Sequence, residues 1–122
     1  MSPEQAARTI DALLAHVWMV RAFLKHSDEA VDDEGLQEIQ RMLYDYHLAV
    51  GGPWAKQDWT GYLHLARKKF SRLRQASEEL TRLGPEVSTH TNFAMAAASL
   101  AAATEEIGKV LEEMKNLPSA QG

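Results

Sequence analysis

The sequence contains no cysteine among its 122 residues. This absence excludes disulfides, thiolate metal ligands and cysteine nucleophiles together. It leaves the redox state of the compartment open.

Long apolar runs are also missing. The longest one, residues 93–103, is rich in alanine, and it is too short to cross a bilayer, which takes about 20 residues. Glu4, Arg8 and Asp11 interrupt the N-terminal region, which argues against the apolar core of a signal peptide. We therefore expect a soluble, cytoplasmic protein with no membrane partner.

A large excess of one charge is absent as well. The formal net charge is −4, which disfavours general binding of polyanions, so nucleic acid is not an expected partner. Hydrophobic residues make up 45% of the chain and charged residues 25%, as in ordinary globular proteins. We predict a single domain over residues 1–122, with 119–122 as a frayed tail.

Helical periodicity is what the sequence does contain. Apolar residues three and four apart predict a first helix from Pro3 to His26, which begins at Ser2-Pro3, a capping residue followed by a first-turn proline. A second helix starts between Val31 and Gly35. We expect it to end at Gly51-Gly52-Pro53, the strongest helix breaker in the chain.

Two further helices follow in the second half. The third begins at Pro53 or Trp59 and ends at Gly84-Pro85. The fourth begins between residues 86 and 92 and ends at Leu117-Pro118. No alternating pattern is long enough for a sheet. Four helices with short connections predict an all-α, up-down-up-down four-helix bundle.

The last helix is the expected centre of this bundle. Phe93, Leu100, Ile107 and Met114 recur every seven residues, as in a helix packed against other helices. Alanines between them leave room for neighbouring backbones to approach closely. We therefore expect the other helices to lie against it.

The first helix carries a second apolar patch opposite its core face. The patch consists of Ala15, Trp18, Met19 and Ala22. A lone amphipathic helix does not need such a patch. We predict an interface there with a protein partner, most simply in a homodimer, or else on a second face of the last helix.

The five histidines do not form a recognisable metal motif. None has a glutamate three residues before it, so the Glu-x-x-His pairs of di-iron bundles are missing. We predict no metal and no cofactor. His16 and His47 flank the core faces of the first two helices, and we expect both to be partly buried and hydrogen-bonded.

Two residue pairs resemble the Arg-x(4 to 6)-His pattern of HEPN ribonucleases. They are Arg21 with His26 and Arg41 with His47. The resemblance implies a small helical dimer in which arginine binds a phosphate and histidine acts as acid or base. In that family the pattern usually lies late in the domain, whereas both pairs here lie in the first half. A ribonuclease is one alternative function.

A polar cluster is expected at one end of the bundle. The topology places the start of the last helix near the end of the first, and the candidate ligand-binding or partner-binding residues there are His26, Ser88, His90, Thr91 and Asn92. Simple helix capping explains the same residue types. The sequence thus favours a non-enzymatic interaction module that self-associates, with a ribonuclease or a small-ligand site as alternatives.

Overall fold

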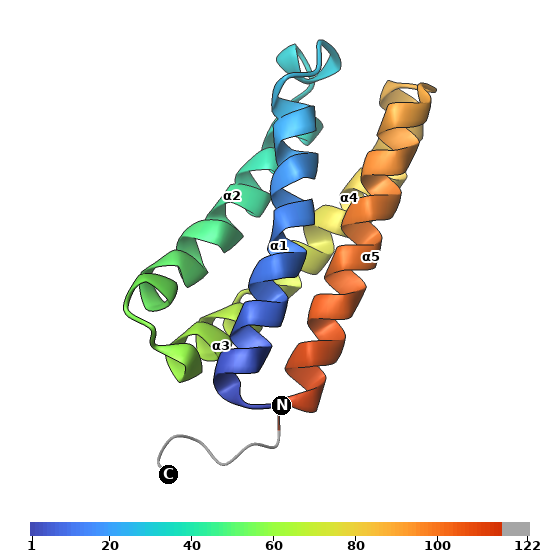
Figure 1. The fold of residues 1–122 in the computed structure, drawn as a ribbon. Coiled ribbons are helices and arrows are strands. Elements are labelled where there is room, and N and C mark those ends of the chain that lie inside the picture. Colours follow the sequence, from blue (N-terminus) through green and yellow to red (C-terminus); the bar gives the residue numbers. More distant parts are fainter. Residues whose placement is uncertain (116–122) are drawn as a thin grey trace.

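The computed structural model describes residues 1–115, and most of these are helical (Figure 1). Five α-helices and one short 3-10 turn pack together, and the described part of the chain has no strand. The elements are α1 (Pro3–Lys25), η1 (Glu29–Val31), α2 (Glu34–Ala55), α3 (Trp59–Lys68), α4 (Phe70–Val87) and α5 (Thr91–Glu113). The all-α prediction is confirmed, but the number of helices differs from the four expected.

The predicted helix starts have clear local causes. The Ser2 hydroxyl accepts a hydrogen bond from the Gln5 amide at 3.1 Å, and the Gln5 side chain accepts one from the Ser2 amide at 2.8 Å. This reciprocal pair satisfies two backbone donors that the helix leaves unpaired. Asp33 caps α2 by accepting from the Leu36 amide at 2.8 Å, and α1 ends at Lys25, one residue before the predicted end.

The predicted break at Gly51-Gly52-Pro53 is wrong, because α2 continues through it to Ala55. The last turn is held by tertiary packing of Trp54, whose ring lies 5.5 Å from the Trp59 ring and 5.8 Å from the Tyr62 ring. The chain turns instead at Gln57, the one non-glycine residue of the described chain with a positive φ, 55°. Packing therefore overrides the local preference of the sequence.

The predicted third helix is two helices, because it is interrupted at Lys69. Ala66 lies in the last turn of α3, where carbonyl groups lack helical partners. The Tyr46 hydroxyl, from α2, donates a hydrogen bond to the Ala66 carbonyl at 2.7 Å. Phe70 lies so close to α5 that a Cβ added at Gly108 would come within 3.0 Å of its ring. Contacts with two other helices thus accompany the bend.

Gly84-Pro85 does not end α4, which continues to Val87. The Ser88 amide donates to the Gly84 carbonyl at 2.9 Å and closes the last turn. Helix α5 begins at Thr91, inside the predicted range. The predicted end at Leu117-Pro118 and the predicted frayed tail at 119–122 lie outside the described residues.

The seven-residue stripe of α5 is buried as predicted. Phe93, Leu100, Ile107 and Met114 are each less than 5% exposed. However, α5 packs mainly against α1 and α4, whereas α2 packs against α1, α3 and α4 (Figure 1). The core is therefore shared between two sides of the molecule, and α5 is not its only centre. None of the helices in residues 1–115 combines the length and the apolar character that crossing a membrane requires.

Candidate functional site

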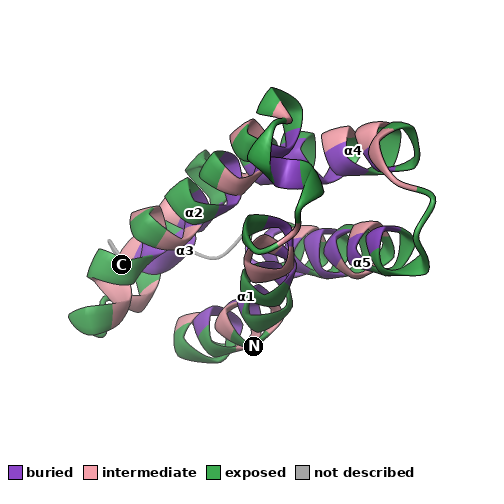
Figure 2. Ribbon diagram, turned by 90° about the horizontal axis from the view of Figure 1, so that it is seen from above, coloured by how far each residue is buried: buried purple, intermediate pink, exposed green. Residues whose placement is uncertain are grey.

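The extra apolar patch of α1 lies on the surface of the molecule. The side chain of Trp18 is 44% exposed and that of Met19 is 67% exposed. Ala15 is exposed as well, and Ala22 is half-buried. Figure 2 shows α1 between α2 and α5, with exposed segments along its outer side. Because neither neighbour covers this side, the patch remains available to a partner.

Helix α2 adds an aromatic and a basic contact to this patch. The Arg21 guanidinium, from α1, lies 4.7 Å from the Trp18 ring and 4.8 Å from the Tyr44 ring of α2. The His47 ring meets the Trp18 ring edge-on at 5.3 Å. Such cation–π and edge-to-face contacts each contribute roughly 0.5–1.5 kcal/mol and favour this arrangement of the side chains. The cluster is therefore partly organised without a partner.

Helix α5 extends the same surface on the other side of α1. Met95 is 59% exposed, and it lines a shallow hollow together with Met19 and Phe23. Met19 also borders a groove of about 380 Å³ between α1 and α2, lined by Asp11, Leu14, Ala15, Trp18 and His47 as well. One surface thus runs over three helices. We call it the α1 face, and it consists of Trp18, Met19, Arg21, Tyr44, His47 and Met95.

Two titratable groups in the groove have perturbed pKa values. Burial lowers the pKa of His47 below its ordinary value, and the nearby Arg21 guanidinium lowers it further. Its Nε2 atom is buried without a hydrogen-bond partner among the described residues, so the expected hydrogen bond is not present. Burial raises the pKa of Asp11, with Arg8 opposing this. The groove therefore favours a neutral imidazole at His47.

His16, which was expected from the sequence to be partly buried, is exposed.

The polar cluster expected at the end of the bundle is only partly assembled. The Ser88 hydroxyl accepts from the His90 amide at 3.0 Å, and His90 Nδ1 accepts from the Asn92 amide at 3.1 Å. Both contacts are capping interactions at the start of α5. Thr91 is exposed, and His26 is exposed at the end of α1.

Ser88 and His90 do line a hollow of about 460 Å³ between α4 and α5. Its other lining residues are Thr81, Gly84, Pro85, Thr89, Phe93, Ala94, Ala97, Ala98 and Ala101. No charged side chain is among them. His26, Thr91 and Asn92 do not line this hollow. Asn92 lines the shallow hollow beside Met19 and Met95 instead, so the five predicted residues do not form one site.

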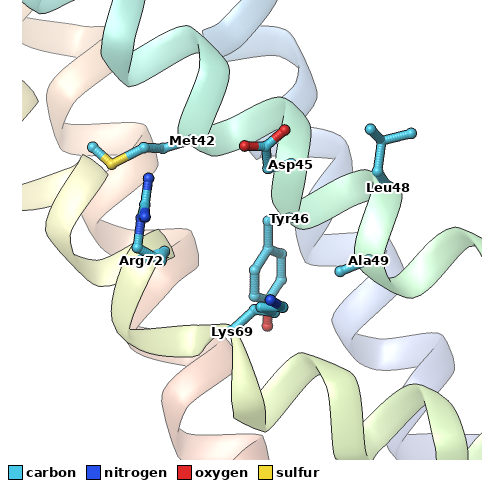
Figure 3. A pocket seen from close by; sticks show the side chains of 7 residues that line it. All are labelled: Met42, Asp45, Tyr46, Leu48, Ala49, Lys69 and Arg72. Atoms are coloured by element: carbon cyan, nitrogen blue, oxygen red, sulfur yellow. The ribbon is translucent and has the colours of Figure 1, made fainter.

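A third hollow, of about 410 Å³, lies where α2 passes the bend between α3 and α4 (Figure 3). Its polar groups are the Asp45 carboxylate on α2 and the side chains of Lys69 and Arg72 at the bend. Arg72 also lies 3.8 Å from the Glu38 carboxylate. Figure 3 shows Tyr46 between the two sides, and its hydroxyl is bound to the Ala66 carbonyl. The shape of this hollow therefore depends on the bend between α3 and α4.

The structure rearranges the two Arg and His pairs of the sequence. Arg21 lies beside His47, which belongs to the other pair. Arg41 forms an ion pair with Glu38, and His26 stands at the end of α1. Within residues 1–115, no group of three or more histidine, aspartate or glutamate side chains is placed to hold a metal ion.

Comparisons with known proteins add no assignment to these sites. No family model, no curated protein and no solved structure matches the chain. The site must therefore be judged on its own chemistry. Sequence reasoning placed Trp18 and Met19 in this patch, assigned Arg21 and His47 to two separate pairs, and missed Tyr44 and Met95. Only the packing of three helices brings these residues together.

Proposed function

We propose that this protein is a non-enzymatic interaction module that binds a protein partner through the α1 face, most simply a second copy of itself. The observation that carries the proposal is the cluster of exposed Trp18 and Tyr44 around the half-buried Arg21. Tryptophan, tyrosine and arginine are the residues most enriched at the energetic centres of protein interfaces. Met19 and Met95 flank the cluster, and methionine is likewise enriched at interfaces.

The arrangement of the cluster supports strong binding. Arg21 is stacked between Trp18 and Tyr44, which come from two helices. Side chains already held in place lose less conformational freedom when a partner covers them. A large apolar side chain gains roughly 1.5–3 kcal/mol when it becomes fully buried, so covering Trp18 and Met19 favours association.

Sedimentation velocity on matched charge variants tests this function. Met19→Glu places a carboxylate on the α1 face, whereas Val31→Glu places one on η1, where Val31 is 69% exposed. We expect Met19→Glu to weaken association by at least about tenfold, since a charge at an apolar contact is costly to desolvate. Val31→Glu should leave association unchanged. Equal effects of both variants, with circular dichroism unchanged, would contradict the proposal.

A second candidate function is small-ligand binding between α4 and α5. The favouring observation is the hollow of about 460 Å³, whose lining includes the Phe93 ring and the alanines of α5 but no charged group. Such a site suits an uncharged, mainly apolar ligand. An uncharged fluorescent naphthylamine is a suitable probe. Ala98→Leu should abolish its binding, and Ala102→Leu, at an exposed position outside the lining, should not.

A further inference from the structure

We infer that the partner of the α1 face is a second copy whose α1 runs antiparallel to the first, around a twofold axis beside Trp18. This inference rests on the proposed function and makes it more specific. It commits to one occupant and to one relative orientation. Three features of α1 lead to it: the order of small and large residues, the opposite charges of Asp11 and Lys25 on either side of Trp18, and the lack of ion-pair partners for those charges among the described residues.

The order of small and large side chains in the patch is the same in both directions along the helix. Ala15 and Ala22 stand three residues outside the large pair Trp18 and Met19. In a twofold interface, if residue i of one copy contacts residue j of the other, residue j of the first copy also contacts residue i of the second. An antiparallel pair of α1 helices therefore sets Ala15 against the partner's Ala22, which lets the backbones approach. Trp18 and Met19 then pack against their own counterparts on either side.

Charges of opposite sign lie at equal distances from Trp18. Asp11 precedes it by seven residues and Lys25 follows it by seven, a spacing that keeps all three on one stripe of the helix. At 1.5 Å per residue, each charge lies about 10.5 Å from Trp18 along the axis. An antiparallel pair brings each Asp11 opposite the partner's Lys25. A parallel pair would instead oppose like charges, which is unfavourable.

Neither charge has an ion-pair partner among the described residues, although the Arg8 guanidinium partly offsets the rise in the pKa of Asp11. Within residues 1–115, no ion pair joins Asp11 or Lys25 to another side chain. Asp11 lines the groove beside Trp18, and Lys25 is exposed in the last turn of α1. Burial at the groove raises the pKa of Asp11, so a nearby cation from a second copy would stabilise its charged form. The charges of Asp11 and Lys25 are thus complementary to those of a second, antiparallel copy of α1.

Mixing two charge-reversed variants tests this arrangement directly. Asp11→Lys opposes lysine to lysine in its own dimer, and Lys25→Asp opposes aspartate to aspartate. We expect each variant alone to dimerise at least about tenfold more weakly than wild type, from like-charge repulsion. An equal mixture restores both attractive contacts in a heterodimer. Native mass spectrometry should show that heterodimer in excess over either homodimer.

A single chain carrying both substitutions is the control for folding. It places the opposite charges back at both ends, so it should dimerise nearly as tightly as wild type even if Asp11→Lys alone perturbs the groove. Loss of association in this double variant, with α-helical circular dichroism intact, would overturn the inference. So would a mixture in which no heterodimer is preferred.

The outcomes separate this inference from the proposed function. If the wild-type chain is monomeric at all concentrations, the second copy is not the partner, and the inference fails. If Met19→Glu dissociates a dimer that both charge reversals leave intact, the α1 face is an interface but the antiparallel arrangement is wrong. If Met19→Glu leaves the dimer dissociation constant unchanged, the α1 face is not the interface and the proposed function itself fails.

Discussion

Helices α1 and α5 have the same length, 23 residues, and pack against each other, but their outer faces differ. The outer side of α1 displays Trp18 and Met19. Apart from Met95, which belongs to the α1 face, the exposed apolar residues of α5 are alanines, namely Ala94, Ala98, Ala101 and Ala102. Alanine favours helix formation by itself and exposes little apolar area. Exposed Trp18 and Met19 add little to the stability of the fold, because they bury little of their apolar area within the molecule. The contrast therefore separates residues that stabilise the fold from residues that are available to a partner.

The largest expected effect lies on the inner side of α5. Leu100 is completely buried, so Leu100→Ala should leave a cavity and lower the free energy of unfolding by about 3 kcal/mol. Ala102→Ser, on the exposed side of the same helix, should change it by less than about 0.5 kcal/mol. Urea unfolding followed by circular dichroism measures both. Similar losses at the two positions would contradict the assignment of inner and outer sides.

The next effect should appear in association and leave stability nearly unchanged. Trp18→Ala removes the ring that Arg21 and His47 contact, and truncation at such a centre costs about 2 kcal/mol or more of binding energy. This corresponds to a dimer dissociation constant roughly thirty times larger. Light scattering at several concentrations measures it, with Val31→Ala as the control for loss of an exposed apolar side chain.

Two tyrosines of α2 sharpen the same contrast. Tyr46 is 1% exposed and its hydroxyl donates to the Ala66 carbonyl, whereas Tyr44 is 40% exposed on the α1 face. Tyr46→Phe leaves that carbonyl without its partner and should lower the free energy of unfolding by about 1–3 kcal/mol. Tyr44→Phe should have almost no effect on it. Thermal unfolding of the two variants side by side gives the answer.

The smallest effect concerns pH. Burial and Arg21 hold the pKa of His47 below its ordinary value of 6.5, so between these two values the unfolded chain binds a proton that the folded chain does not. Stability from this residue is therefore complete above about pH 6.5 and decreases as the pH falls below it. His47→Gln should remove that part of the pH dependence. His64→Gln, at an exposed position of α3, should retain it.

Features of the fold with a local cause within one helix could be predicted from the sequence, whereas features caused by contacts between helices could not. Periodicity placed the buried stripe of α5, and local capping chemistry placed the starts of α1 and α2. The bend at Lys69 could not be predicted, because its associated contacts come from Tyr46 and Gly108 on other helices. Packing of Trp54 likewise carried α2 past a strong local breaker.

The same holds for the residues of the α1 face. Trp18 and Met19 were found because both fall outside the core stripe of a single helix. Arg21 and His47 were assigned to separate pairs, since spacing along the chain says nothing of which α2 residue faces α1. The seven-residue intervals from Asp11 to Trp18 to Lys25 are visible in the sequence, but their meaning depends on knowing that this side of α1 is uncovered.

The most direct test of the central claim is the mass of the wild-type chain and of Met19→Glu by sedimentation equilibrium across micromolar concentrations. The account predicts a reversible dimer for the wild type and a monomer for the variant, with identical circular dichroism. A wild-type chain that remains monomeric throughout would contradict self-association, and a dimer that persists in Met19→Glu would show that its interface is not the α1 face.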